Sequence, residues 1–153
     1  MNEAEKLNEI SDFFHKMNNK IILIKLLTKA KSEYDKYDFT NGKLTLREAY
    51  KIDKNNPATL RGLGCLELFN KNFNRAIQYY LKALKYSENK ETEYTLIGMA
   101  YYLQDKTEDA VNYFNLAIDE NDSYTSAYEG RNQAMLENHL KITDLQDSLK
   151  KYF

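Results

Sequence analysis

Side chains that could carry chemistry are few in this chain, and their spacing suits neither catalysis nor metal binding. His15 and His139 are far apart in the sequence and lack the short spacing of a metal-binding pair. Cys65 has no base near it in the sequence, which favours a small apolar side chain over a nucleophile. Three acidic residues surround a predicted helix start, where the helix dipole favours negative charge: Glu88, Glu91 and Glu93. We therefore predict no catalytic residue, no metal site and no cofactor, and the protein is not expected to be an enzyme.

The composition also excludes several classes of partner. With 22 basic and 23 acidic residues, the formal net charge is -1, which does not suit binding to the phosphates of nucleic acid. The longest aliphatic run covers residues 21–24 and is far shorter than the ~20 residues that cross a bilayer, so no membrane insertion is expected. The single cysteine excludes an internal disulfide, and the first residues lack the pattern of a secretory signal. A cytoplasmic protein is expected.

The elements that must position any site are predicted to be helices. Asn2 and Glu5 form a capping-box pattern, and Asn56 before Pro57 is a strong helix start. The pair Asn18-Asn19 is predicted to separate the first two helices. The expected helices cover 2–17, 20–34, 41–52, 57–70, 73–86, 91–104, 107–119 and 124–137, with a last one opened by a capping box of Thr143 and Gln146 before Leu145, Leu149 and Tyr152.

The sequence repeats itself with a period of 34 residues. Gly64 aligns with Gly98 and Ala76 with Ala110 at this shift. Three further columns hold alanine or large apolar residues: Ala49, Ala83 and Ala117; Leu46, Tyr80 and Phe114; Leu60, Tyr94 and Tyr128. A period of this length is typical of stacked helix pairs, and small residues are needed where two helices approach closely.

On these residues the chain resembles the tetratricopeptide repeat family. One segment reads Leu60-x-x-Leu63-Gly64, then Phe73-x-x-Ala76-x-x-x-Tyr80-x-x-Ala83. The next reads Tyr94-x-x-Ile97-Gly98-x-x-Tyr101, then Ala110-x-x-x-Phe114-x-x-Ala117. Residues 23–56 resemble a weaker repeat, with Ala30, Phe39, Gly42, Leu46 and Ala49 in matching columns.

The resemblance implies an all-α fold, a right-handed superhelix of antiparallel helix pairs. We expect about three to four repeats (23–56, 57–90, 91–124 and a degenerate capping repeat 125–153) within an array covering 19–153. In the last repeat Asn132 replaces the glycine and Asp144 occupies a small-residue column, which suits an end that meets water. Residues 1–18 are expected to form a separate amphipathic helix with a stripe of Leu7, Ile10, Phe13, Phe14 and Met17.

In this family the first helix of each pair lines a concave groove that holds a peptide or a partner helix. The resemblance therefore implies a partner-binding groove with an apolar and aromatic middle. Its residues by register are Leu27, Lys31, Tyr34, Arg61, Cys65, Leu68, Phe69, Thr95, Met99, Tyr102, Leu103, Gln133 and Leu136. The alternative for any of these is a core position. The family's clamp for acidic chaperone tails is absent, because its columns hold Leu27, Lys31, Gly62, Ser126 and Gly130.

The leading hypothesis is a non-catalytic module that binds another protein or a peptide in this groove. One alternative is a chaperone similar to those that protect translocators of type III secretion, which the length and repeat number resemble. Another is a structural scaffold that forms a homodimer through residues 2–17. The helix at 2–17 has three alternative roles: capping the first repeat, filling the groove, or pairing with a second copy.

Overall fold

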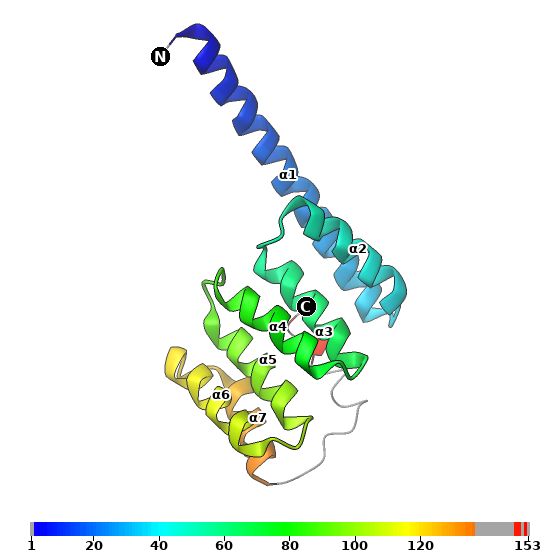
Figure 1. Cartoon of the computed structure of the whole chain (residues 1–153), viewed down its shortest axis with the longest axis vertical. Helices are drawn as coiled ribbons and strands as arrows, with labels where there is room; N and C mark the ends of the chain where they lie inside the picture. The colour runs from blue at the N-terminus through cyan, green and yellow to red at the C-terminus, as the bar shows by residue number, and fades with distance from the viewer. Residues whose placement is uncertain (1, 137–148, 151, 153) are drawn as a thin grey trace. The chain divides into compact units, whose positions relative to one another are not determined.

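Antiparallel helix pairs form the chain wherever the computed structural model describes it, which is at residues 2–136, 149, 150 and 152 (Figure 1). These residues contain no strand and form the helices α1 (Glu3–Asp35), α2 (Phe39–Ile52), α3 (Pro57–Phe69), α4 (Phe73–Leu84), α5 (Lys90–Tyr102), α6 (Thr107–Glu120) and α7 (Thr125–Met135). The all-α prediction is confirmed. The chain divides into unit 1, residues 1–54, and unit 2, residues 55–153. The expected helix start at Thr143 lies outside the described residues.

Unit 1 consists of the long helix α1 and the shorter α2. The predicted break at Asn18-Asn19 is wrong, because α1 continues through both residues and is 33 residues long. Asparagine lowers helix stability by only a few tenths of a kcal/mol, and neither glycine nor proline occurs nearby. The side chain of Asn19 also contacts that of His15, one turn earlier, at 3.2 Å. The predicted capping box is present, since Glu5 N donates to Asn2 Oδ1 at 2.8 Å.

Two different faces of α1 carry apolar residues. Leu23, Ala30 and Tyr34 are buried, and the Tyr34 ring meets Phe39 at the start of α2 edge to face. The other stripe, which includes Leu7, is exposed. Figure 1 shows the reason within unit 1: the N-terminal half of α1 extends past the end of α2.

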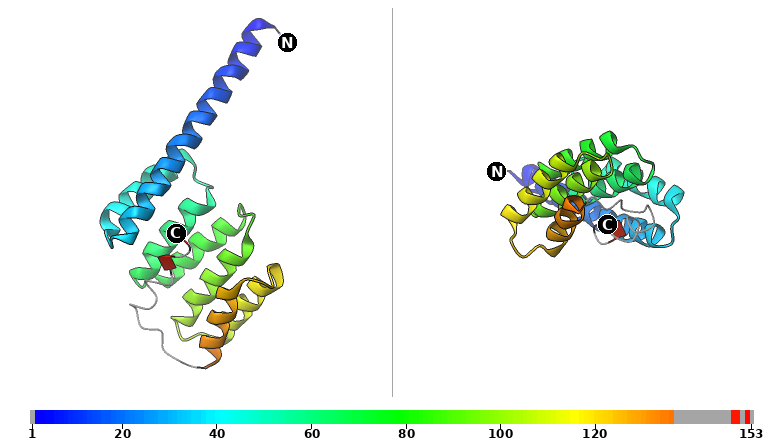
Figure 2. Two further views of the ribbon diagram at one scale, coloured as in Figure 1. Left: turned by 180° about the vertical axis from the view of Figure 1, so that it is seen from behind. Right: turned by 90° about the horizontal axis from the view of Figure 1, so that it is seen from below.

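Unit 2 stacks the pair α3–α4 on the pair α5–α6, and α7 follows against α5 and α6 (Figures 1 and 2). The predicted small-residue columns are confirmed, because Ala76, Ala83, Ala110 and Ala117 are completely buried. A Cβ atom on Gly64 would lie 2.4 Å from Tyr80 Cε1. Glycine is therefore required on the first helix so that the aromatic ring of the second helix can lie against its backbone.

Phe114 on α6 is enclosed by two glycines. A Cβ atom would lie 2.8 Å from its ring on Gly98 and 2.5 Å from it on Gly130. The register of 34 placed the missing glycine of the last repeat at Asn132, but Gly130 on α7 makes this close contact instead. Gly98 and Gly130 thus allow both α5 and α7 to approach the same ring, which is 1% exposed.

The turns inside the helix pairs repeat as well. Tyr37, Lys71 and Asp105 follow first helices at intervals of 34 residues and have φ values of 60°, 60° and 57°. After α3, Asn72 N donates to Glu67 O at 2.8 Å and Lys71 N donates to Leu68 O at 3.0 Å. This is the Schellman arrangement, in which glycine is the usual residue at the left-handed position. None of the three positions holds glycine.

Replacing Lys71 with glycine is therefore expected to raise the free energy of unfolding by about 1 kcal/mol. The lysine side chain opposes a positive φ, and glycine adopts it without that cost. Urea unfolding followed by circular dichroism measures the change. Lys71→Ala keeps the Cβ atom and should give no gain. A glycine variant no more stable than the alanine variant would contradict the assigned turn.

Candidate functional site

The surface formed by α3, α5 and α7, the first helices of their pairs, is called here the first-helix face. Contacts join α5 to α7, and side chains described below join α3 to α5. The second helices α4 and α6 lie on the other side of unit 2 (Figure 2). All the predicted groove residues of unit 2 belong to this face or to the ends of its helices. Its two halves differ in chemistry.

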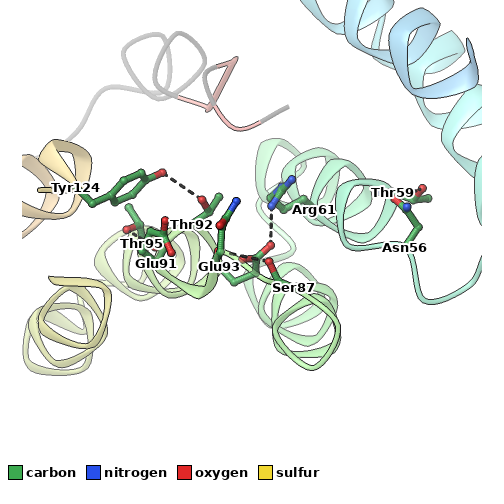
Figure 3. Close-up of polar contacts among 10 residues, drawn as sticks. Asn56, Thr59, Arg61, Ser87, Glu91, Thr92, Glu93, Thr95 and Tyr124 are labelled. Carbon is green, nitrogen blue, oxygen red and sulfur yellow. Dashed lines mark hydrogen bonds and ion pairs between the residues drawn. The ribbon is translucent and has the colours of Figure 1, made fainter. Parts of the chain in front are cut away.

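The N-terminal half of the face contains an ion pair between α3 and α5 (Figure 3). Arg61 Nη1 lies 2.8 Å from Glu93 Oε1, and the exposed fractions of the two side chains are 21% and 0%. Sequence analysis placed Arg61 in the groove and assigned Glu93 only to a helix start. Because a buried carboxylate needs a counter-charge, the role of Arg61 as it stands is to neutralise Glu93. Its charge is therefore not free for an acidic ligand.

Polar contacts also join α5 to the segment that enters α7. Asn121 Nδ2 donates to Glu91 Oε1 at 3.4 Å, and the hydroxyls of Thr92 and Tyr124 are 3.4 Å apart (Figure 3). The pairs Arg61–Glu93 and Thr92–Tyr124 both span 32 residues. This spacing, two less than the repeat, is the sequence signal by which contacts between successive first helices could have been found.

The chain's own C-terminal residues contact this polar half. Leu149 is completely buried, and Tyr152 is 9% exposed. Burial raises the pKa of Tyr152, whose hydroxyl is hydrogen-bonded to Ser126 and Tyr124. The sequence identified Leu149 and Tyr152 only as an apolar stripe. In the structure, Tyr152 covers the start of α7.

Three of the predicted groove residues form the floor of the face. Cys65, Leu68 and Thr95 are at most 1% exposed. The Tyr80 hydroxyl donates to Cys65 Sγ at 3.5 Å, and burial raises the pKa of Cys65 to about 11. A thiol held protonated in this way is a poor nucleophile, as the sequence indicated.

We expect the Cys65 thiol to react with a disulfide reagent at pH 8 about 100-fold more slowly, or slower still, in the folded protein than in urea. The raised pKa also has a sign for stability. Below pH 9 the thiol is protonated in both states, so stability is unaffected; between about pH 9 and 11 only the unfolded chain ionises, so stability falls. Equal reaction rates with and without urea would show that Cys65 is accessible.

The C-terminal half of the face is apolar. Phe69, Met99, Tyr102 and Leu103 are half-buried, and Leu136 is 69% exposed. Met99 and Tyr102 pack against a buried cluster of Ala110, Phe114 and Ala134, which holds α5 beside α7. Gln133 is exposed on α7.

The Tyr102 hydroxyl lies in this apolar half, and it is buried without a hydrogen-bond partner among the described residues. Burial, and then the charge of Asp105, raises the pKa of this phenol. A buried tyrosine hydroxyl usually has a partner, so an unpaired one indicates a position that a ligand group or a water can fill.

The remaining predicted residues belong to unit 1. Leu27 is half-buried and Tyr34 is buried, whereas Lys31 is exposed and lies 3.6 Å from Asp35. An exposed pair of this kind contributes little to stability. The site described here is accordingly confined to residues of unit 2.

Within the described part of the chain, no group of three or more His, Cys, Asp or Glu side chains could hold a metal ion. His15 is exposed on α1, and His139 lies outside the described residues. No helix among those described is both long and apolar enough to cross a membrane.

Comparison with known proteins agrees with this architecture. Residues 62–90 and 94–124 match the family model of the tetratricopeptide repeat. The chain is similar to the TPR domain of Arabidopsis OM64, with a TM-score of 0.68 and 17% identity over 78% of this chain and 99% of that one. It is also similar to the N-terminal domain of stress-induced protein-1 from C. elegans (TM-score 0.60, 16% identity, 72% and 92% covered). For MamA the TM-score is 0.66, with 18% identity over 100% of this chain and 91% of that one. No curated protein matches the chain in sequence.

A helical solenoid of stacked pairs, glycines against aromatic rings and two matched repeats thus define the class. The chain is a tetratricopeptide repeat protein. Proteins of this fold are in general protein–protein interaction modules without catalytic activity. The low identities to the solved structures extend to the fold alone.

Proposed function

We propose that unit 2 binds a short peptide segment of another protein on the apolar half of the first-helix face. The contact residues are Phe69, Met99, Tyr102, Leu103, Gln133 and Leu136. Cys65, Leu68 and Thr95 support them from below. Met99 adapts to side chains of different shape, and the aromatic rings offer large contact area with little loss of conformational freedom.

The observation that carries this proposal is the environment of Tyr102. Its ring packs with Met99 against the α6–α7 cluster, yet its buried hydroxyl has no partner among the described residues. A peptide backbone supplies one carbonyl acceptor and one amide donor per residue. A bound peptide can therefore accept a hydrogen bond from Tyr102 while an aliphatic or aromatic side chain packs on Met99 and Leu103.

Charge argues against recognition through a ligand carboxylate. Arg61 already pairs with Glu93 at 2.8 Å, and the clamp columns hold no arginine. The affinity therefore comes from two or three apolar anchors, as at other interfaces in which a few buried residues dominate binding.

A displayed library of random peptides, panned against the full-length protein, supplies the probe. An enriched peptide is then titrated by fluorescence anisotropy. Tyr102→Phe removes only the hydroxyl and should weaken binding about 2–10-fold. The double variant Phe69→Glu/Tyr102→Glu should abolish binding, because the two charges would face apolar anchors.

The matched control is Leu116→Glu, which adds a charge to an exposed apolar residue of α6. It should leave the affinity unchanged. Circular dichroism shows whether each variant is folded. A folded double variant with the affinity of the original protein would place the binding site elsewhere.

A further inference from the structure

A heptad seam runs along the exposed side of α1. Its residues follow the alternating spacing of three and four that characterises the a and d positions of coiled coils. Their side chains are between 42% and 66% exposed: Leu7, Ile10, Phe14, Met17, Ile21 and Ile24. Six large apolar side chains in one line on a preformed helix are far more than the isolated exposed residues found on ordinary surfaces.

The partner helix of unit 1 does not cover this seam. α2 packs against the stripe that contains Leu23, Ala30 and Tyr34. At 3.6 residues per turn, that stripe is centred roughly 140° around the helix from the seam. The seam is therefore free along its whole length, and a second helix can lie on it without displacing α2.

We propose that the seam pairs with the seam of a second copy of this chain in an antiparallel coiled coil. In the symmetric register, Leu7 of one copy lies opposite Ile24 of the other. Ile10 then lies opposite Ile21, and Phe14 opposite Met17. All six apolar side chains of each copy are covered in this register, over ~26 Å of helix.

The charge distribution along α1 favours the antiparallel orientation. Its first ten residues contain one basic residue, Lys6, and four acidic ones: Glu3, Glu5, Glu9 and Asp12. Residues 16–31 contain no acidic residue and five basic ones: Lys16, Lys20, Lys25, Lys29 and Lys31. Antiparallel pairing places the acidic half of each copy beside the basic half of the other, whereas parallel pairing places like charges together.

The positions that flank the seam give the same answer. In a parallel pair, position g of one helix meets position e of the next heptad on the other, which brings Lys20 against Lys25 twice. In the antiparallel register Lys20 lies beside Phe13, and its methylene stem can cover the ring. Isoleucine at d positions, here Ile10 and Ile24, is also unfavourable for a parallel dimer.

A lipid surface is a weaker candidate for the same seam. Amphipathic helices that bind anionic membranes are rich in lysine and arginine on the polar face. The N-terminal half of α1 instead has an excess of acidic residues. Anionic membranes would repel the half of the helix that carries Leu7, Ile10 and Phe14.

The first test is the mass of the full-length protein by sedimentation over about 1–200 µM, a range that covers micromolar self-association. We expect a dimer at the upper concentrations. Phe14→Glu should shift the protein to a monomer, whereas Asn8→Glu, which adds the same charge on the opposite side of α1, should leave the dimer intact. Because the structure shows no contact of residues 7–17 with α2, circular dichroism should show both variants folded. A monomer throughout, or a dimer unaffected by Phe14→Glu, would overturn the proposal.

The second test fixes the orientation by oxidation of single-cysteine seam variants, in which the buried Cys65 is a bystander. A mixture of Leu7→Cys and Ile24→Cys copies should form the mixed disulfide. Leu7→Cys alone should not cross-link, because the two thiols lie ~26 Å apart. Efficient cross-linking of Leu7→Cys to itself would establish parallel pairing instead. A monomer that binds vesicles of anionic lipid would assign the seam to membranes.

Discussion

Replacing Phe114 with alanine is expected to lower the free energy of unfolding of unit 2 by about 3–5 kcal/mol. The ring is 1% exposed and lies against the backbone of both α5 and α7. Two helices that approach the ring at glycines cannot close a cavity left between them without moving past one another. Urea unfolding monitored by circular dichroism measures the loss.

Adding a methyl group at Gly98 or Gly130 gives this prediction a sharper form. In the original protein, Gly98→Ala or Gly130→Ala should be destabilising, because the new Cβ atom would lie 2.8 or 2.5 Å from the Phe114 ring. In the Phe114→Ala background the same change should be stabilising by about 1 kcal/mol, because alanine favours a helix and the clash has gone. The sign of the effect should therefore reverse.

The matched control is Gly42→Ala on α2. A Cβ atom there would have its nearest neighbours at 3.9 Å, an ordinary contact. This change should be neutral or stabilising in either background. If Gly98→Ala and Gly130→Ala also stabilise the original protein, these glycines do not enclose Phe114 as described.

Arg61→Ala is expected to destabilise unit 2 by about 3–5 kcal/mol, the second large effect. The change leaves the carboxylate of Glu93 completely buried with no counter-charge, and desolvation of a single ion is costly. Glu93→Gln should cost less, since it leaves a charged but partly exposed Arg61. The double variant Arg61→Met/Glu93→Leu should recover much of the stability, because apolar side chains of similar size often replace a buried ion pair without loss.

Arg75→Ala provides the comparison for an exposed arginine. Arg75 Nη1 lies 3.9 Å from Glu67 Oε2, and its side chain is 66% exposed. Its removal should cost at most about 1 kcal/mol, as is usual for exposed pairs. Equal losses for Arg61→Ala and Arg75→Ala in parallel urea titrations would show that burial of Glu93 does not decide the effect.

Much of the fold could be predicted because helix packing requires particular residue sizes at regular intervals. Gly64 and Gly98 recur at 34 residues since an aromatic ring must reach the helix backbone in each repeat. The break at Asn18-Asn19 was predicted wrongly for a related reason. Two asparagines lower helix stability only slightly, so their presence does not decide whether a helix ends.

The site could be predicted as a face but not in depth. Periodicity places Cys65, Met99 and Leu136 on first helices with equal weight, because it specifies only an angle around each helix. Their exposure differs widely: Cys65 is buried, Met99 is half-buried and Leu136 is exposed. Exposure depends on what the neighbouring helix places above each residue, which is a property of the packed repeats.

The sequence by itself determined the helix pairs, the columns of small residues and the absence of catalytic spacings, since these follow from interactions within about one repeat. Only the tertiary structure decided that Arg61 neutralises Glu93, that Gly130 meets Phe114 and that Tyr152 covers the start of α7. These contacts join different repeats, so their existence depends on how one helix pair is rotated against the next. The apolar half of the first-helix face and the exposed seam of α1 are the surfaces that this packing leaves available.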